Sequence, residues 1–483
     1  MLFNSYEFLL GFLPLMLAVF FLLARWSTRA AAWSLAIGSL VFYGWWDARY
    51  LALLASSIVF NFMAGRLIDA RRDRQVSWPV TLAVVANLSL LGVFKYADFF
   101  IGSANAVGAQ LDLLHLVLPM GISFFTFTQI AFLVDVHRGL VKEKDFSHFL
   151  LFVTWFPHQI AGPVLHHKQM MPQFASPQTY RINAEAISVG LTMLTIGLIK
   201  KVVFADSLSV HASPVFDAAA QGRELTMEAA WTGALAYTFQ LYFDFSGYSD
   251  MAIGLSRMFN VRLPLNFDSP YKSANIIDFW RRWHMTLSQF LRDYLYVPLG
   301  GNRHGEPRRY LNLFLTMLLG GLWHGAGWTF VFWGALHGLY LIVNNLWRKA
   351  TGHDPSRPSH PVVHVLCVAL TFLCVLLAWV PFRAASMDVT WAFYQAMFGL
   401  NASWTGLPAW DFMAWMVAGS AVIWGLPNAQ QFLAGYRPAW DSVKVSGTLL
   451  WRPTALHGAW LGVLFGVALV AVSGVGEFLY FQF

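Results

Sequence analysis

One histidine stands in the middle of an otherwise apolar stretch, "GGLWHGAGW", at residues 320–328. An imidazole ordinarily titrates near neutral pH, and histidine is the side chain that most often serves as a general base. Ionisable groups inside apolar segments are rare and point first to function. The glycines around it permit close approach of a backbone or a ligand; they are Gly320, Gly321, Gly325 and Gly327. We therefore expect His324 to be a catalytic base. The alternative is a core histidine bonded to a carbonyl group.

A second candidate, His284, follows the aromatic and basic cluster "WRRW" of residues 280–283. It lies in residues 243–309, a moderately polar stretch that is rich in charge and in Trp and Tyr. Connections of this length in compact proteins are usually functional. Within it, Ser273 predicts the N-cap of a helix over residues 275–296. The alternative for His284 is an interfacial histidine flanked by arginines whose stems lie in the apolar layer.

The remaining ionisable residues in apolar segments favour structural roles. Three histidines surround the "AGP" of residues 161–163, namely His158, His166 and His167. Their spacing does not match a closed zinc site and no carboxylate or cysteine is near, so no metal site is predicted. His337 is interpreted as a structural residue of a helix. Asp244 and Asp250 are expected to pair with nearby arginines or to cap a re-entrant turn.

Several common catalytic motifs are missing from the sequence. It contains neither a Walker loop nor a G-x-S-x-G elbow, and the glycines of "GLWHGAGW" are not followed by the Lys or Ser that a phosphate-binding loop needs. The residues alone therefore support a membrane enzyme in which a buried histidine base acts on a hydroxyl group.

The composition is that of a protein with many membrane crossings. Of the 483 residues, 57% are hydrophobic and only 12% are charged, whereas soluble domains have about 25% charged residues. Since a spanning helix needs about 20 mainly apolar residues, we expect about ten or eleven spans. The candidate windows are residues 7–23, 31–46, 51–68, 80–94, 149–164, 187–204, 229–245, 311–324, 329–346, 362–380, 413–424 and 459–475.

The net charge of +7 is interpreted as a topology signal, and no nucleic-acid partner is expected. Short loops rich in Lys and Arg stay in the cytoplasm. Basic residues follow the first and third windows, namely Arg25 and Arg29, then Arg66, Arg71, Arg72 and Arg74. The sequence therefore predicts that the N-terminus lies outside the cytoplasm. The first window lacks a preceding basic residue and a small-residue cleavage site, so we expect it to remain as a helix.

Three stretches interrupt the helical pattern with prolines, glycines or charges: residues 118–139, 155–174 and 243–309. Irregular polar backbone at membrane depth is tolerated only where it is buried in protein or lines an aqueous cavity. We therefore expect an all-α transmembrane bundle with re-entrant or interfacial helices around a central channel, formed as one integral-membrane domain over residues 1–483.

The segments that carry these features resemble the membrane-bound O-acyltransferase family, and more narrowly its bacterial alginate O-acetyltransferase membrane-subunit branch. The similarity lies in "FWRRWHMTLSQFLRDYLYVPLGGNR" at residues 279–303, in "GLWHGAGW", and in the C-terminal "FLYFQF" at residues 478–483. The segments "FPHQIAGPVLHHKQMMPQF" and "DVHRG" also fit, although the family more often has an aromatic residue at His137. The match covers nearly the whole chain.

The resemblance implies that His324 is the catalytic histidine and that His284 is the second family residue. It implies a channel through the membrane in which a cytosolic acyl donor meets an acceptor from the other side. The residues expected to bind substrate or line this channel are Trp323, Trp280, Arg282, Tyr271, Asn275 and Trp328. We expect the two imidazoles to face one cavity with their side chains within about 10 Å, near enough to contact one substrate. His284 would position a substrate or stabilise the developing oxyanion.

The resemblance also implies a bacterial inner-membrane protein that acetylates an extracellular polysaccharide such as alginate. The expected donor is acetyl-CoA or another acyl thioester, with no bound cofactor and no metal. The expected partners are periplasmic acetyltransferase- or esterase-like proteins, together with membrane lipid. The alternatives are acetylation of cellulose or a cell-wall glycan, D-alanyl transfer to teichoic acid, a polysaccharide or acyl transporter without chemistry of its own, and a passive scaffold for a secretion complex.

Overall fold

The computed structural model describes residues 1–71, 76–141, 145–160, 162–352, 360–404, 406–443, 445, 449–472 and 479, and within these residues it contains helices and turns but no strand. The all-helical prediction is confirmed. Arg72, Arg74 and all of "FLYFQF" except Leu479 lie outside the described residues. The chain forms two compact units. Unit 1 is Met1–Leu198, Tyr248–Leu265 and Ala429–Gly474, and unit 2 is Ile199–Gly247, Asn266–Asn428 and Val475–Phe483.

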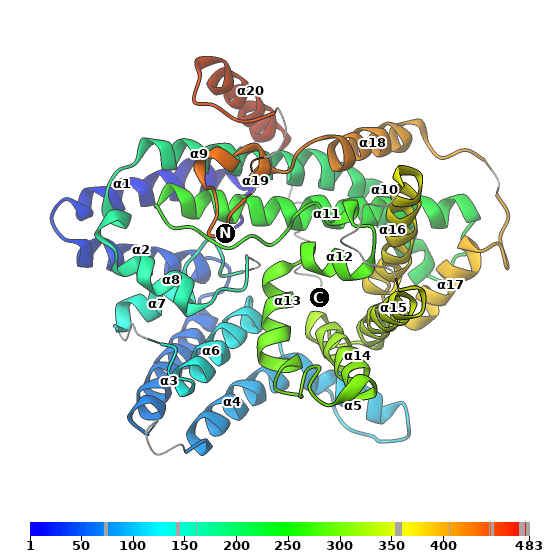
Figure 1. Cartoon of the computed structure of the whole chain (residues 1–483), viewed down its shortest axis with the longest axis horizontal. Coiled ribbons are helices and arrows are strands. Elements are labelled where there is room, and N and C mark those ends of the chain that lie inside the picture. Colours follow the sequence, from blue (N-terminus) through cyan, green and yellow to red (C-terminus); the bar gives the residue numbers. More distant parts are fainter. Residues whose placement is uncertain are drawn as a thin grey trace. The chain divides into compact units, whose positions relative to one another are not determined.

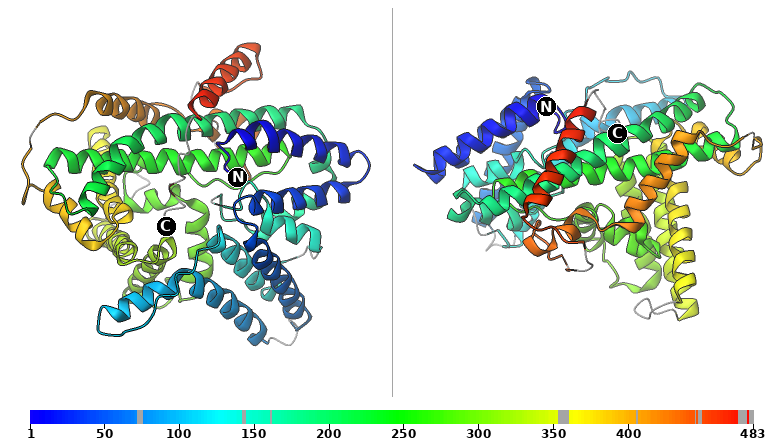
Figure 2. Two further views of the ribbon diagram at one scale, coloured as in Figure 1. Left: turned by 180° about the vertical axis from the view of Figure 1, so that it is seen from behind. Right: turned by 90° about the horizontal axis from the view of Figure 1, so that it is seen from above.

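Unit 1 is built from helix pairs that follow one another along the chain. α1 and α2 lie side by side as the blue pair in Figures 1 and 2, and α6 packs on both α3 and α4. Its α-helices are α1 (Leu13–Ala24), α2 (Thr28–Gly44), α3 (Arg49–Arg71), α4 (Trp78–Leu91), α5 (Ala97–Asn105), α6 (Ile122–His137), α7 (Phe146–Thr154), α8 (His167–Ala175), α9 (Ala184–Leu198), α19 (Ala429–Phe432) and α20 (Ala455–Ala471). Unit 1 also contains residues 248–258 of α11 (Met227–Met258), the π-helical segments η1 (Glu7–Phe12) and η3 (Gly92–Tyr96), and the 3-10 helices η4 (Pro177–Tyr180) and η9 (Ala434–Tyr436).

A buried amide pair joins α3 to α4. Asn61 and Asn87 exchange two side-chain hydrogen bonds, of 3.1 and 2.7 Å between nitrogen and oxygen. Next to them, Gln129 of α6 donates to the hydroxyl of Ser57 at 3.0 Å. Asn61 and Gln129 have no exposed surface. Lipid tails are as apolar as the side chains of membrane helices, so the hydrophobic effect does not drive these helices together. Hydrogen bonds between polar side chains of neighbouring helices help to hold them in contact.

Unit 2 contains both predicted catalytic histidines. Its α-helices are α10 (Asp206–Ala220), the residues up to Gly247 of α11 (Met227–Met258), α12 (Ile276–Arg282), α13 (Met285–Leu291), α14 (Gly305–His324), α15 (Trp328–Thr351), α16 (Pro361–Arg383), α17 (Met387–Met397) and α18 (Trp410–Ser420). Unit 2 also contains the π-helical segments η5 (Ile199–Ala205), η7 (Arg292–Tyr296) and η8 (Ala421–Gly425) and the 3-10 helix η6 (Pro270–Lys272). α14 and α15 pack along one another, and α16 packs on α15 (Figure 1).

Glycines allow the close approach of α14 and α15. A Cβ atom added to Gly321 would collide with the carbonyl oxygen of Phe330, and one added to Gly334 would meet the backbone of α14 at Met317 and Leu318. A Cβ atom on Gly325 would collide with the ring of Phe330. The sequence predicted that the glycines around His324 permit close approach of either a backbone or a ligand, and the structure shows close approach of backbone and side-chain atoms.

Six helices of the described part of the chain are long and apolar enough to cross a membrane. They are Glu7–Ala24, Arg49–Arg71, Trp78–Asn105, Ala184–Ala220, Trp328–Thr351 and Pro361–Arg383, and Ile122–His137 and Ala455–Ala471 are shorter apolar helices. Other predicted windows fall in α2, α11 and α14 or in shorter helices. The window at residues 149–164 does not form one helix, because α7 ends at Thr154. The count of about ten or eleven spans stays a prediction.

Candidate active site

His324 is the last residue of α14, just before the extended Gly325 that separates this helix from α15. Its side chain is buried, with 5% of the residue exposed. Aromatic rings surround the imidazole: the ring centroids of Trp323, Trp333 and Phe382 lie 4.9, 5.1 and 5.2 Å from its own. Water is therefore largely kept from this imidazole by apolar walls from α14, α15 and α16.

His284 lies between α12 and α13 in the left-handed region, with φ at 43°. The single helix expected over residues 275–296 is therefore wrong, because the chain breaks at Trp283 and His284. The break is held by backbone pairing: the Met285 amide donates to the Asn266 carbonyl oxygen, and the Asp268 amide donates to that of Arg282, both at 2.9 Å. Such backbone strain persists only where its surroundings over-determine it, and it concentrates at functional sites.

The two histidines come together in unit 2. They are 40 positions apart in sequence (324 − 284), and their ring centroids lie 6.2 Å apart at an interplanar angle of 59°. The prediction that their side chains would lie within about 10 Å is confirmed. His284 is completely buried, and this burial lowers its pKa to about 3, because a charged imidazolium would lose its hydration. At neutral pH the His284 ring is therefore uncharged.

Sequence comparison relates the chain to one enzyme family. Residues 141–359, which include both histidines, match the membrane-bound O-acyltransferase family. The chain is 44% identical to the peptidoglycan O-acetyltransferase of Helicobacter pylori (83% of this chain, 80% of that one) and 45% identical to the probable alginate O-acetylase AlgI of Azotobacter vinelandii (84% and 79%). The chain belongs to the membrane-bound O-acyltransferase family. It is an O-acyltransferase and a membrane protein.

A more distant relative has a different acyl group in its name. The teichoic acid D-alanyltransferase of Streptococcus thermophilus is 26% identical over 79% of this chain and 93% of its own. The two O-acetyltransferase relatives, at 44% and 45%, have different acceptors in their names. The relatives of higher identity are therefore named for acetyl transfer, and the relative named for D-alanyl transfer is of lower identity.

Two predicted tryptophans of this O-acyltransferase lie in or beside the histidine pair. Trp323 is 3% exposed, and its ring centroid lies 4.9 Å from that of His324 and 6.2 Å from that of His284. Trp280 lies farther out, where its indole N–H donates to Nδ1 of His337 at 3.2 Å and its ring contacts Trp333. Trp323 therefore contacts both imidazoles, whereas Trp280 supports the aromatic wall from behind.

Tyr271 belongs to the same aromatic group and is 2% exposed. Its hydroxyl donates to the Thr238 carbonyl oxygen at 2.8 Å and accepts the indole N–H of Trp379 at 3.2 Å. Trp379 in turn stacks on Trp333, which borders His324. The hydroxyl of Tyr271 therefore ties the segment before α12 to the helices α11 and α16.

The other three predicted residues occupy the margins of this region. Asn275, not Ser273, caps α12: its Oδ1 accepts the amide N–H of Asp278 at 2.9 Å. Arg282 pairs with Asp278 at 3.0 Å and is one-third exposed. The ring of Trp328 opens α15 and is 59% exposed. The structure therefore gives Asn275 and Arg282 local structural partners. Trp328 is exposed, unlike the buried Trp323.

Sequence reasoning missed Trp333, Phe382 and Asn266, which help to build this site, and it interpreted His337 as a structural residue of a helix. Trp333 and His337 lie one helical turn apart on α15, where Trp333 contacts both His324 and His337 at 5.1 and 4.8 Å between centroids. Their four-residue spacing could have indicated a shared face. Phe382 and Asn266 come from distant segments, and no local pattern marks them.

Asp244 has a structural partner that differs from the predicted one. Its carboxylate contacts the ammonium group of Lys201 at 2.7 Å and accepts the backbone N–H of Leu479 at 3.2 Å. The prediction of an arginine partner is wrong, since the partner is a lysine of η5. Both side chains are buried, with 3% and 1% exposed, and Lys201 also pairs with Asp206 at 2.8 Å.

The structure also locates the histidines of the "AGP" segment. Nε2 of His158 lies 3.1 Å from the Phe152 carbonyl oxygen, and His167 lies 3.5 Å from the carboxylate of Asp135. Within the described ranges, no group of three or more His, Cys, Asp or Glu residues is placed to hold a metal ion.

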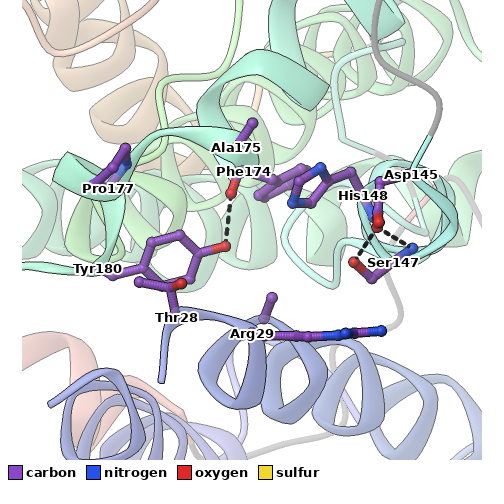
Figure 3. Close-up of a pocket in the computed structure, with 10 residues that line it drawn as sticks. Thr28, Arg29, Asp145, Ser147, His148, Phe174, Ala175, Pro177 and Tyr180 are labelled. Atoms are coloured by element: carbon purple, nitrogen blue, oxygen red, sulfur yellow. Dashed lines mark hydrogen bonds between the residues drawn. The ribbon is translucent and has the colours of Figure 1, made fainter. Parts of the chain in front are cut away.

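Unit 1 has a cleft of about 310 Å³ that contains none of the predicted site residues. In Figure 3, Thr28 and Arg29 of α2 face Asp145, Ser147 and His148 at the start of α7 across this cleft. Hydrogen bonds from Ser147 lower the pKa of Asp145 below its ordinary value, so this carboxylate is ionised at neutral pH. The cleft belongs to unit 1 and the histidine pair to unit 2.

Proposed function

We propose that this enzyme transfers an acetyl group from an acyl thioester, acetyl-CoA, to a hydroxyl group, with His324 as the general base. The observation that carries this proposal is the pair of buried imidazoles 6.2 Å apart among aromatic rings. A neutral imidazole is suited to accept a hydroxyl proton near pH 7. The rings of Trp333 and Phe382 exclude water, which limits hydrolysis of the thioester.

In the reaction assigned to this site, one proton moves from the acceptor hydroxyl to His324 and then to the departing thiol. The hydroxyl oxygen attacks the thioester carbonyl carbon while His324 takes the hydroxyl proton. The C–O bond then forms as the C–S bond breaks, and the proton held by His324 passes to the departing sulfur. His324 is neutral again at the end, so one imidazole serves as base and then as acid.

We infer that the final acceptor is an extracellular polysaccharide, reached through periplasmic acetyltransferase- or esterase-like partner proteins. This inference rests on the relatives named for alginate and for peptidoglycan. Alginate or a similar exopolysaccharide is the first choice, and a cell-wall glycan is the second. One domain over residues 1–483 would provide the channel between the cytosolic donor and these partners.

Deletion of the gene tests the acceptor class. We expect the strain that lacks the protein to lose O-acetyl groups from its secreted polysaccharide, because this protein would supply the acetyl groups to the partner proteins. Acetyl signals in proton NMR spectra of purified secreted polysaccharide and of purified peptidoglycan give the measurement. Loss from peptidoglycan alone would support the second choice, and unchanged acetylation of both glycans would contradict the proposal.

The proposed location is the bacterial inner membrane, with the N-terminus in the periplasm and the loop that holds Arg25 and Arg29 in the cytoplasm. Short basic loops resist translocation. We expect a cysteine in place of Arg29, in a protein whose Cys367 and Cys374 are replaced, to react with a membrane-impermeant maleimide only after cell lysis. Arg29 is exposed, so its position is open to the reagent. Labelling of intact cells would reverse the proposed orientation.

A further inference from the structure

Asn266 bonds to His284 from 18 positions upstream. Its Oδ1 atom lies 3.0 Å from Nδ1 of His284, and it also accepts the backbone N–H of Thr286 at 3.4 Å and the hydroxyl of Thr286 at 2.9 Å. A backbone amide can only donate, so the network identifies the amide atom at this point as the oxygen. Since this oxygen accepts, Nδ1 of His284 must carry the hydrogen.

This hydrogen bond determines where His284 can accept a proton. A neutral imidazole has one N–H donor and one nitrogen lone pair. With the hydrogen on Nδ1, the lone pair is on Nε2, an atom that is buried and has no hydrogen-bond partner in the described part of the chain. His284 therefore offers an acceptor, whereas a neutral ring of the other tautomer would offer a donor.

The surrounding backbone holds this arrangement in place. Asn266 and His284 are both completely buried. The two backbone hydrogen bonds between residues 266–268 and 282–285 keep the Asn266 side chain beside the ring. Neither side chain can exchange its partner for water without breaking this pairing, so the tautomer is determined by the fold.

We propose that Asn266 is a positioning residue that keeps the lone pair of His284 on Nε2, where it accepts a hydrogen bond from His324 once His324 has taken the hydroxyl proton. This proposal rests on the proposed role of His324 as the base. Protonated His324 has two N–H donors and a positive charge. With ring centroids 6.2 Å apart, a small shift or one bridging water would join the two rings. The proton stays on His324 until it passes to the departing sulfur.

The other tautomer of His284 would oppose this step, because its Nε2 would carry a hydrogen and have no lone pair with which to accept from protonated His324. Among the described residues, rings in contact with His284 come from Phe245 of α11 and from Trp323 and His324 of α14. Asn266 is the contact from the segment before α12. Of these four groups only His324 titrates, so a charge placed at position 266 would act mainly on the two histidines.

NMR spectroscopy of the full-length protein in lipid nanodiscs, with labelled histidine, tests the tautomer directly. The signals of His284 are assigned from their absence in a His284→Asn sample, since asparagine tolerates the left-handed conformation. We expect the wild-type ring to show Nδ1–H, and the Asn266→Ala ring to show a mixture or mainly Nε2–H. A wild-type ring with Nε2–H, or an unchanged tautomer in Asn266→Ala, would overturn the proposal.

A substitution that adds a charge at position 266 but keeps the hydrogen bond from His284 tests whether the tautomer of His284 matters for catalysis. In Asn266→Asp a carboxylate still accepts from Nδ1–H, but it favours the imidazolium form and raises the pKa of His284. A protonated His284 has no lone pair to offer. We expect the pKa of His284 to rise by about one to three units. On the acid side of the pH–rate profile the rate of Asn266→Asp should therefore fall more steeply than that of the wild type, because both histidines are then protonated there. The rate is measured as free thiol released from acetyl-CoA by the protein in nanodiscs, with alginate oligosaccharide supplied as the hydroxyl acceptor.

A matched control separates this effect from the general cost of a new carboxylate. Asn345 of α15 accepts a hydrogen bond from Arg309 through Oδ1 at 2.7 Å, so Asn345→Asp keeps its contact and should leave the pH profile unchanged. Asn266→Ala should lower kcat by about 10–100-fold with little change in KM, as loss of the partner that orients a histidine does elsewhere. Equal pH profiles in Asn266→Asp and wild type would overturn the proposal. Absence of thiol release by the wild type would instead contradict the proposed function.

Discussion

His324→Gln is expected to reduce acyl transfer to near background while the protein remains folded and inserted. Glutamine has a similar size and can still form hydrogen bonds, but it cannot take up a proton in the physiological pH range. General-base catalysis typically contributes about 10²–10⁴-fold to a rate, and the polysaccharide should lose acetyl groups to the same extent. The measurement is the acetyl content of the polysaccharide at equal protein levels, together with thiol release from acetyl-CoA.

The control for this prediction is His364→Gln on the exposed side of α16. It makes the same chemical change away from the aromatic site and should leave both readings as in the wild type. If His324→Gln retained much of the wild-type activity, His324 would be a structural or binding residue. The role of base would then pass to His284, or the transporter alternative would be favoured. A pure transporter or a passive scaffold should tolerate the loss of this imidazole better than an enzyme.

Asp244→Ala is expected to reduce the amount of folded protein strongly. The substitution leaves the buried ammonium group of Lys201 without its 2.7 Å partner and removes the acceptor for the Leu479 amide. Breaking one side of a buried ion pair costs about 3–5 kcal/mol when the remaining charge is left uncompensated. Asp206 still pairs with Lys201 at 2.8 Å, so the expected loss lies at the lower end of this range. Thermal unfolding of the purified protein in detergent, followed by size-exclusion chromatography, gives the measurement.

Two further variants identify the cause of this loss. Asp206→Asn removes the more exposed partner of Lys201, whose side chain is 30% exposed, and should destabilise the protein less. Combining Lys201→Met with Asp244→Leu removes both buried charges and should recover much of the stability lost in Asp244→Ala. An Asp244→Ala protein that unfolds like the wild type would show that the ion pair contributes little to the fold.

The sequence by itself was sufficient for the helical class, for the membrane character of the chain and for the expectation that two distant histidines lie close together. Composition and apolar windows depend on local hydrophobicity, which is readable without any tertiary contact. The motifs around His284 and His324 indicated the family, and the expected proximity of the two rings agrees with the 6.2 Å between their centroids. Trp323 and Tyr271 also lie within the aromatic group.

Only the tertiary structure decided how these residues are held. The predicted helix over residues 275–296 breaks at His284 because backbone bonds to Asn266 and Asp268 outweigh the helical preference of the local sequence. The lysine partner of Asp244 lies 43 positions upstream (244 − 201). Asn266, which determines the tautomer of His284, is 18 positions away from it. These contacts join segments that are far apart along the chain, and no periodic pattern of residues in the sequence predicts them. They stabilise the fold only once the helices pack and exclude water from the polar groups.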